Sequence, residues 1–211
     1  MMRTFSGRMV DLKNFSEQDI DLRDIAISLC RQNRYLGHTA MPWSVAQHSI
    51  LCGMIAQLVG LSASLQQAIF IHDVHETWFQ DIISPIIQEY ATQSYKEDQK
   101  KADRVIFKFF GLEHHLDNES SIQMTKLVDK VALVIEQIFL RPGYDYAIDR
   151  GSWSHEVTRM VDFLISEGFV IDKALIEMPP NVCGQQFYEV LAVMHFEATT
   201  GTEIVVDAPS A

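Results

Sequence analysis

The stretch that decides the fold is residues 44–60, SVAQHSILCGMIAQLVG. Ser44 is a typical helix N-cap, and Gly60 is a typical stop signal. Between them, apolar residues recur at the three- and four-residue spacing of one helix face. The residues on this face are Val45, His48, Leu51, Cys52 and Ile55. The stretch therefore predicts a helix that places a histidine on its apolar side.

The same helical period covers most of the chain. It predicts further helices at about 20–29, 62–79, 94–110, 120–140, 153–167 and 183–198, with Ser120 or Ser121 capping the helix at 120–140. Strands are expected only at residues 170–171 and 203–206. No repeat or linker divides the chain, so the sequence predicts one all-α domain, a helical bundle over residues 1–211. Residues 1–10 are expected to be mobile and residues 201–211 to form a flexible tail.

The composition excludes several classes of protein. A chain of 211 residues with 47% hydrophobic residues can bury one good core, which excludes a disordered protein. The net charge of −11 excludes a general binder of duplex nucleic acid, since phosphate contacts need a basic face. The cysteines at 30, 52 and 183 are far apart, which favours neither a metal knuckle nor a disulfide framework. With no signal-peptide pattern and no long apolar run, a cytoplasmic protein with no membrane segment is expected.

Residues 69–81, IFIHDVHETWFQD, hold a dense group of ionisable side chains. On a continuous helix His72 and Glu76 share one face, because they are four residues apart. An exposed, polar helix end is the alternative interpretation of this segment. Asp129 precedes the apolar run 131–135, and a carboxylate there must be paired or metal-bound unless it lies on the surface.

Four residues form a candidate metal set: His48, His72, Asp73 and Asp129. Two imidazoles and two carboxylates from three helices suit Zn²⁺, Mn²⁺, Co²⁺ or Mg²⁺ and leave positions for water and substrate. Taken singly, each residue has a simpler interpretation. His48 can be a hydrogen-bonded core histidine, and the other three can be surface charges.

The order His…His-Asp…Asp resembles that of the HD-domain metal-dependent phosphohydrolases. Further motifs are similar to small bacterial and phage members of this family, which include deoxynucleoside 5′-monophosphate phosphatases and phage dATP triphosphohydrolases. These motifs are TFSGR (4–8), DLRDIA (21–26), RYLGHT (34–39), SVAQHS (44–49), HDVHE (72–76) and DIISP (81–85). The resemblance covers residues 4–140 and implies a helical bundle of the HD-domain type.

The resemblance also implies roles for site residues. It assigns the divalent metal to His48, His72, Asp73 and Asp129. Glu76 and Asp81 match the acids that transfer protons, and Arg34 matches the arginine that holds the substrate phosphate. These residue types fit phosphoryl transfer, which needs charge neutralisation and positioning more than covalent catalysis.

Three further residues are judged from the sequence itself. Tyr35 is the best candidate wall for a sugar or base, with core packing as its alternative. Lys126 lies three residues before Asp129 on the same helix face and is a second candidate cation for substrate binding. An exposed position without function is its alternative. His75 is expected to be a packing or surface residue.

The implied function is metal-dependent hydrolysis of 2′-deoxynucleoside 5′-phosphates. The first expectation is that dATP is cleaved to deoxynucleoside and triphosphate, for which Lys96, Lys126 and Lys130 could supply the extra positive charge. A 5′-nucleotidase acting on deoxynucleoside monophosphates is one alternative. A non-catalytic, metal-stabilised module that binds nucleotides is the other. The resemblance also implies a homo-oligomer.

Overall fold

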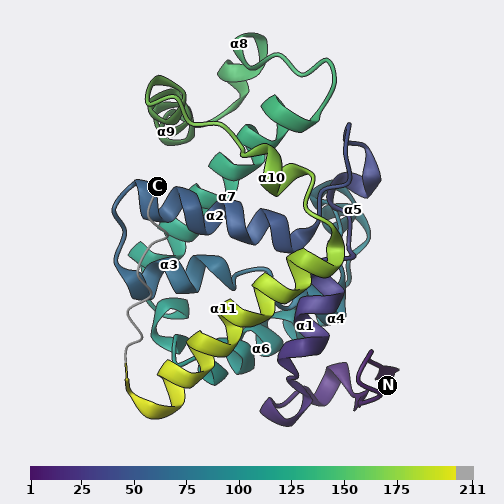
Figure 1. Cartoon of the computed structure of the whole chain (residues 1–211). Coiled ribbons are helices and arrows are strands. Elements are labelled where there is room, and N and C mark those ends of the chain that lie inside the picture. The colour runs from purple at the N-terminus through teal and green to yellow at the C-terminus, as the bar shows by residue number, and fades with distance from the viewer. Residues whose placement is uncertain (203–211) are drawn as a thin grey trace.

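Helices build almost all of the computed structural model, which describes residues 1–202 except for the side chain of Ser84 (Figure 1). The α-helices of this part of the chain are α1 (Leu22–Leu29), α2 (Val45–Leu58), α3 (Ala63–Phe70), α4 (Glu76–Phe79), α5 (Ser84–Tyr90), α6 (Gln93–Phe109), α7 (Glu119–Leu140), α8 (Tyr146–Asp149), α9 (His155–Ser166), α10 (Lys173–Ile176) and α11 (Pro180–Thr200). Five short 3-10 helices lie before and between them, at Leu12–Asn14, Glu17–Asp19, Arg34–Gly37, Glu113–Leu116 and Arg150–Ser152. The all-α prediction is confirmed.

The helix predicted from residues 44–60 forms as α2. The side chain of Ser44 accepts a hydrogen bond from the backbone N–H of Gln47, and the side chain of Gln47 accepts one from the backbone N–H of Ser44. This reciprocal capping box satisfies two backbone donors that the helix leaves free. The helix start is therefore set locally, four residues before His48.

The single helix predicted at 62–79 is wrong. Helix α3 ends at Phe70, residues 71–75 form a turn, and α4 begins at Glu76. In the turn the N–H of Val74 bonds the carbonyl of Ile71 at 3.0 Å, a three-residue step instead of the four-residue step of an α-helix. His72 and Glu76 consequently do not share a helix face, and the turn directs His72 and Asp73 inward.

Other boundaries also differ from those predicted. Asn118 caps α7 by accepting from the N–H of Ser121, so neither Ser120 nor Ser121 is the cap. Helix α11 starts at Pro180 instead of 183, since proline fits the first helical turn. Residues 170–171 form no strand. The expected strand at 203–206 lies outside the described residues, as does most of the expected tail.

Residues 1–10 form a small hairpin in place of the expected mobile segment. Strand β1 (Met2–Arg3) pairs antiparallel with β2 (Met9–Val10). The hairpin is anchored to α1, because the backbone N–H and the hydroxyl of Ser6 each donate to the carboxylate of Asp24 at 2.7 Å.

The core has two parts that meet along α2 and α3. One part packs α1, α6 and α11 together through residues such as Leu29, Ile106 and Phe187. The other packs α2, α7 and α9 through residues such as Leu51 and Ile135. In Figure 1 the long α11 crosses α1, and α2 runs above α3, against which it packs. Among the described residues, no helix is both long and apolar enough to cross a membrane.

Candidate metal centre

Four polar side chains converge where α2, α7 and the turn 71–75 meet. They are the four residues predicted as metal ligands: His48, His72, Asp73 and Asp129. Nε2 of His48 lies 3.3 Å from Oδ1 of Asp129 and 3.5 Å from Oδ2 of Asp73. Nε2 of His72 lies 3.2 Å from Oδ1 of Asp73 and 3.8 Å from Oδ1 of Asp129. The structure thus brings this whole predicted set together.

Both imidazoles are oriented through their other nitrogen. Nδ1 of His48 lies 2.6 Å from a carboxylate oxygen of Glu136, and Nδ1 of His72 lies 2.7 Å from the carbonyl oxygen of Ile69. Both partners are acceptors, so each Nδ1 carries a proton and donates. The two Nε2 atoms are left to face the carboxylates, which is the usual arrangement of metal-ligating histidines.

This donor set fits a divalent cation. Nε2 of His72 is buried and makes no hydrogen bond within the described part of the chain. Ligand bonds of about 2.1 Å place neighbouring donor atoms about 3.0–3.4 Å apart, close to the N–O distances observed here. Burial raises the pKa of Asp129, but the adjacent His48 and His72 outweigh it and hold that pKa well below its ordinary value. Asp129 therefore presents an ionised oxygen.

Cys52 is a further potential ligand that sequence reasoning placed on the same stripe but did not assign. Its Sγ lies 3.5 Å from Nε2 of His48, and Cys52, His48 and His72 offer ligand atoms that all lie within 4.8 Å of one another. These three residues could hold a metal ion. Burial raises the pKa of the Cys52 thiol, however, and a protonated thiol is a poor ligand. The ionised carboxylate of Asp129 is therefore a better partner for the imidazoles than this thiol.

Glu136 joins the metal cluster to Arg34, and the sequence analysis missed it. Its carboxylate is fully buried and accepts from Nε1 of Trp43 at 2.9 Å and from the hydroxyl of Tyr35 at 2.5 Å, in addition to its bond with His48. Nε of Arg34 lies 3.4 Å from the same carboxylate. Burial raises the pKa of Glu136, but Arg34 and His48 outweigh it and hold the pKa at about 2. The sequence does contain a signal for this residue, because Glu136 is the one acidic residue within the apolar stretch 131–140.

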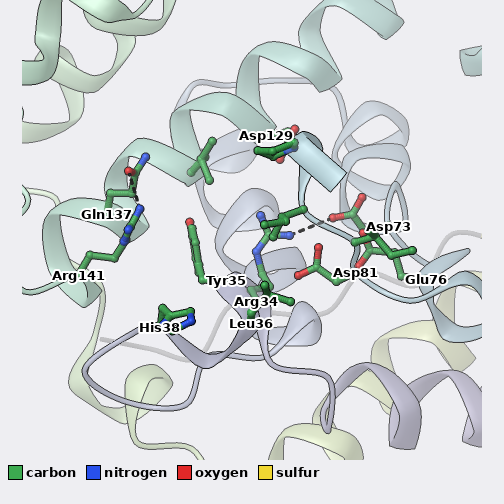
Figure 2. Close-up of a pocket in the computed structure, with 14 residues that line it drawn as sticks. Arg34, Tyr35, Leu36, His38, Asp73, Glu76, Asp81, Asp129, Gln137 and Arg141 are labelled. Carbon is green, nitrogen blue, oxygen red and sulfur yellow. Dashed lines mark hydrogen bonds and ion pairs between the residues drawn. The ribbon is translucent and has the colours of Figure 1, made fainter. Parts of the chain in front are cut away.

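A cavity of about 540 Å³ opens over the acidic side of the cluster (Figure 2). The residues that line it are Arg34, Tyr35, Leu36, His38, Asp73, Glu76, Asp81, Ile82, Ile83, Pro85, Asp129, Leu133, Gln137 and Arg141. One cavity thus contains five of the predicted site residues. They are two predicted metal ligands (Asp73 and Asp129), both predicted proton-transfer acids (Glu76 and Asp81) and the predicted phosphate-binding arginine (Arg34). An apolar side formed by Ile82, Ile83 and Leu133 completes it.

The two acids of the cavity hold their protons more tightly than free carboxyls. Burial, together with the charges of Asp73 and Asp81, raises the pKa of Glu76 to about 9. One oxygen of Glu76, Oε2, is buried without a hydrogen bond among the described residues. Burial also raises the pKa of Asp81, which Arg34 opposes. Both acids thus have raised pKa values, and that of Glu76 is high enough to keep this carboxyl protonated near neutral pH.

Gln32 holds the segment that carries these acids. Its side-chain N–H groups donate to the carbonyl of Glu76 at 3.0 Å and to the hydroxyl of Ser28 at 2.8 Å, and its carbonyl oxygen accepts from the N–H of Asp81 at 3.3 Å. Between the two acids, Gln80 has φ 64° and ψ 155°, a conformation that is almost restricted to glycine. The Gln32 contacts offset the strain that this turn stores.

Tyr35 forms part of the cavity wall, and its hydroxyl is already bonded to Glu136. Tyr35 and Leu36 both have positive φ, 57° and 53°, so the backbone that follows Arg34 is strained. The Tyr35 ring has two guanidinium groups near it, with Cζ of Arg34 at 5.7 Å and Cζ of Arg141 at 5.8 Å from its centroid. Arg141, which sequence reasoning treated only as a helix end, therefore adds a second cation to the cavity.

The remaining candidates lie elsewhere. Lys126 lines a separate hollow between α7 and the start of α9, together with Lys130, and does not reach the cavity of Arg34. His75 was expected to pack or lie on the surface. It is buried except for 16% of its side chain, with Nδ1 2.9 Å from Oδ1 of Asp103 on α6. Burial lowers the pKa of His75, but the carboxylate of Asp103 outweighs this effect and raises the pKa to about 9.

No protein-family model matches the chain. The chain is 35% identical over 111 residues to the uncharacterized protein YfdR of Escherichia coli strain K12, a match that covers 53% of this chain and 58% of that protein. It is 33% identical over 88 residues to the uncharacterized protein RCAP_rcc00048 of Rhodobacter capsulatus, covering 40% of this chain and 45% of that one. The matches thus span about half the length of these curated relatives. Neither name describes an activity.

Proposed function

We propose that this protein is a divalent-metal-dependent phosphohydrolase of the HD-domain type that its sequence resembles, acting on 2′-deoxynucleoside 5′-phosphates. The observation that carries the proposal is the convergence of His48, His72, Asp73 and Asp129. Their nitrogen and oxygen atoms approach within 3.2–3.8 Å of one another beside a cavity lined by arginine and carboxyl groups.

These four residues would hold Zn²⁺, Mn²⁺, Co²⁺ or Mg²⁺, which supplies Lewis-acid stabilisation of charge on a phosphoryl group. Arg34 is fixed by two ion pairs, with Asp73 at 3.5 Å and Glu136 at 3.4 Å. A guanidinium held in this way offers its cavity-facing N–H groups to phosphate oxygens without losing further side-chain entropy.

Glu76 and Asp81 are the residues proposed to transfer protons. Hydrolysis joins a water oxygen to phosphorus and breaks the bond between phosphorus and the 5′-oxygen. The water loses a proton, and the departing 5′-oxygen gains one. Asp81 accepts the first proton and Glu76 supplies the second, because Glu76 is the acid that stays protonated near neutral pH.

The cations of the cavity favour a monophosphate substrate over the triphosphate that the sequence first indicates. A triphosphate brings about two more negative charges, which need additional cations. Arg34 and Arg141 line the cavity, whereas Lys126 and Lys130 line a different hollow. The ionised carboxylate of Asp129 also lines the cavity and repels further negative charge. A deoxynucleoside 5′-monophosphate is therefore the proposed substrate.

A nucleotide panel tests this function. The protein is loaded with each of the four metals in turn and mixed with dAMP, dATP and AMP, and nucleoside and phosphate are measured with and without EDTA. Release of deoxynucleoside from dAMP, reduced at least about 100-fold by EDTA, is the expected result. Nucleotide binding without turnover under every metal would instead indicate a non-catalytic binding module and would overturn the enzymatic proposal.

A further inference from the structure

Two buried thiols face each other outside the cavity. Cys30 is the C-cap residue of α1, and Cys183 lies in the first turn of α11. Their Sγ atoms are 2.9 Å apart, and the residues are 4% and 1% exposed. A disulfide bond measures about 2.05 Å, so less than about 1 Å of movement separates the pair from a covalent link.

We propose that Cys30 and Cys183 form a reversible disulfide by exchange with a low-molecular-weight disulfide of the glutathione type. The two residues are 153 positions apart in the sequence, so spacing alone gives no indication of the pair. The packing of α1 against α11 creates it.

Close helix packing holds the two sulfurs in place. Gly184 follows Cys183 and faces α1, where a Cβ atom would lie 3.8 Å from the carbonyl oxygen of Ala26 and 3.9 Å from Sγ of Cys30. These are ordinary van der Waals distances, so α11 lies in direct contact with the end of α1 at this position. Because both cysteines sit on packed helices, their facing arrangement is part of the fold and does not depend on a loop.

A hollow of about 650 Å³ lies beside this contact, although neither cysteine lines it. One of its lining residues, Gly184, follows Cys183 in the chain, and a Cβ atom there would lie 3.9 Å from Sγ of Cys30. Its other lining residues are Arg23, Ala26, Ile27, Arg31, Pro180, Asn181, Gln185 and Tyr188. None of these lining residues is acidic, although the whole chain has a net charge of −11. The two arginines can bind the carboxylates of a glutathione-type disulfide. This molecule also carries the disulfide sulfurs that the exchange requires.

Cys183 is the thiol that reacts first. Cys30 donates a hydrogen bond to Sγ of Cys183, and this bond lowers the pKa of Cys183. The residues just before it, at 180–182, are exposed, so opening one helical turn brings Cys183 to the hollow.

The exchange balances without another oxidant. The Cys183 thiolate attacks one sulfur of the small disulfide, forms a mixed disulfide, and releases a thiolate that takes up the proton lost by Cys183. Cys30 then loses its proton and attacks Sγ of Cys183. The second small thiol leaves with that proton. Two protein thiols are oxidised to one disulfide, and one small disulfide is reduced to two thiols.

The test uses the full chain in glutathione buffers at pH 8, quenched with acid and unfolded before free thiols are counted. The reduced protein has three thiols, one for each cysteine. After oxidation by glutathione disulfide we expect a single free thiol, on Cys52, and a peptide that links Cys30 to Cys183. The melting temperature should rise by about 5–15 °C, since the link closes a long loop of the unfolded chain. Excess reduced glutathione should reverse both changes.

Single variants separate the steps. Cys30→Ser should retain one glutathione on Cys183, because no thiol is present to displace it. Cys183→Ser should leave Cys30 unmodified. Three free thiols in the oxidised wild-type protein would overturn the proposal. A disulfide that includes Cys52, or a stable glutathione adduct on wild-type Cys183 without the intramolecular link, would overturn it as well. The wild-type result stands even if a variant folds poorly.

Discussion

The carboxylate of Glu136 accepts a hydrogen bond from Nδ1 of His48 at 2.6 Å, with both side chains fully buried. This contact fixes the imidazole so that Nε2 points at Asp73 and Asp129. The same carboxylate pairs with Arg34. One buried acid therefore orients a proposed metal ligand and a proposed phosphate-binding group together.

Glu136→Gln should weaken both arrangements. Glutamine keeps the shape of the side chain but removes the charge that balances Arg34. Loss of a partner that orients a ligating histidine reduces metal affinity by about 10–100-fold. Arg34 keeps Asp73 as a partner, so the free energy of unfolding should fall by less than the about 3–5 kcal/mol of a fully broken buried pair. Metal titration and urea unfolding should record both losses. Unchanged metal affinity would show that His48 does not depend on Glu136.

Removal of a ligand should remove the metal. His72→Ala and Asp73→Ala should each bring bound divalent metal, measured by inductively coupled plasma mass spectrometry, from about one equivalent to near zero. Asp117→Ala is the matched control, because Asp117 is an exposed carboxylate paired with Arg104. Wild-type metal content in both ligand variants, with the fold intact by circular dichroism, would contradict the assignment.

Gln32→Ala tests the support of the two acids. Loss of its bonds to Glu76 and Asp81 should leave these acids less well positioned and lower kcat about tenfold, since each hydrogen bond contributes about 1 kcal/mol. KM and metal content should stay close to wild type, which separates positioning from general damage. Gln18→Ala, at an exposed position, serves as the control. Equal loss of metal and kcat would mean that Gln32 maintains the whole site.

Local signals explain why parts of the fold were predictable. The cap at Ser44 and the helical period after it lie within one short segment, and α2 forms as they indicate. The turn at 71–75 has no such signal, because it contains neither glycine nor proline and its polar residues also fit a helix end. It depends on burying His72 and Asp73 against α2 and α7, which are distant in sequence.

The residues of the candidate site were likewise predictable only in part. The predicted ligands were recognisable because a histidine on an apolar stripe and an aspartate before an apolar run are unusual. Glu136 lies in such a run as well, but its partners Trp43, Tyr35 and His48 come from another part of the chain. Arg141 follows the last residue of α7, and only the folded chain brings it to Tyr35.

His115 should make stability depend on pH. Burial and the charge of His114 lower the pKa of His115 below its ordinary value of 6.5. The folded state therefore favours the neutral ring, which contacts Ser64 on α3 and Ser121 on α7. This contribution is present above pH 6.5 and is lost as the pH falls below it. Between pH 7.5 and pH 5.5, the urea midpoint of unfolding should decrease more in the wild type than in His115→Gln. Equal decreases would contradict the prediction.

Arg141 should decide how the proposed substrate is held. It is exposed at the end of α7, reaches the cavity beside Tyr35, and has Gln137 as its hydrogen-bond partner at 3.4 Å. Arg141→Ala should therefore raise KM for dAMP about tenfold or more, with little change in kcat or stability. Arg141→Lys should recover only part of this loss, since an ammonium group lacks the planar fork. Arg159→Ala on α9 is the control for an exposed arginine outside the cavity.

Wild-type kcat/KM and the variant Lys126→Ala distinguish the two substrates. If a monophosphate occupies the cavity, Arg34 and Arg141 meet its charge, and wild-type kcat/KM should be higher for dAMP than for dATP. If a triphosphate binds, its outer phosphates must extend beyond these arginines, and Lys126 is then the predicted additional cation, although it lines another hollow. Lys126→Ala should then reduce dATP hydrolysis while sparing dAMP. Faster turnover of dATP than of dAMP, together with this effect of Lys126→Ala, would reverse the substrate assignment and retain the metal site.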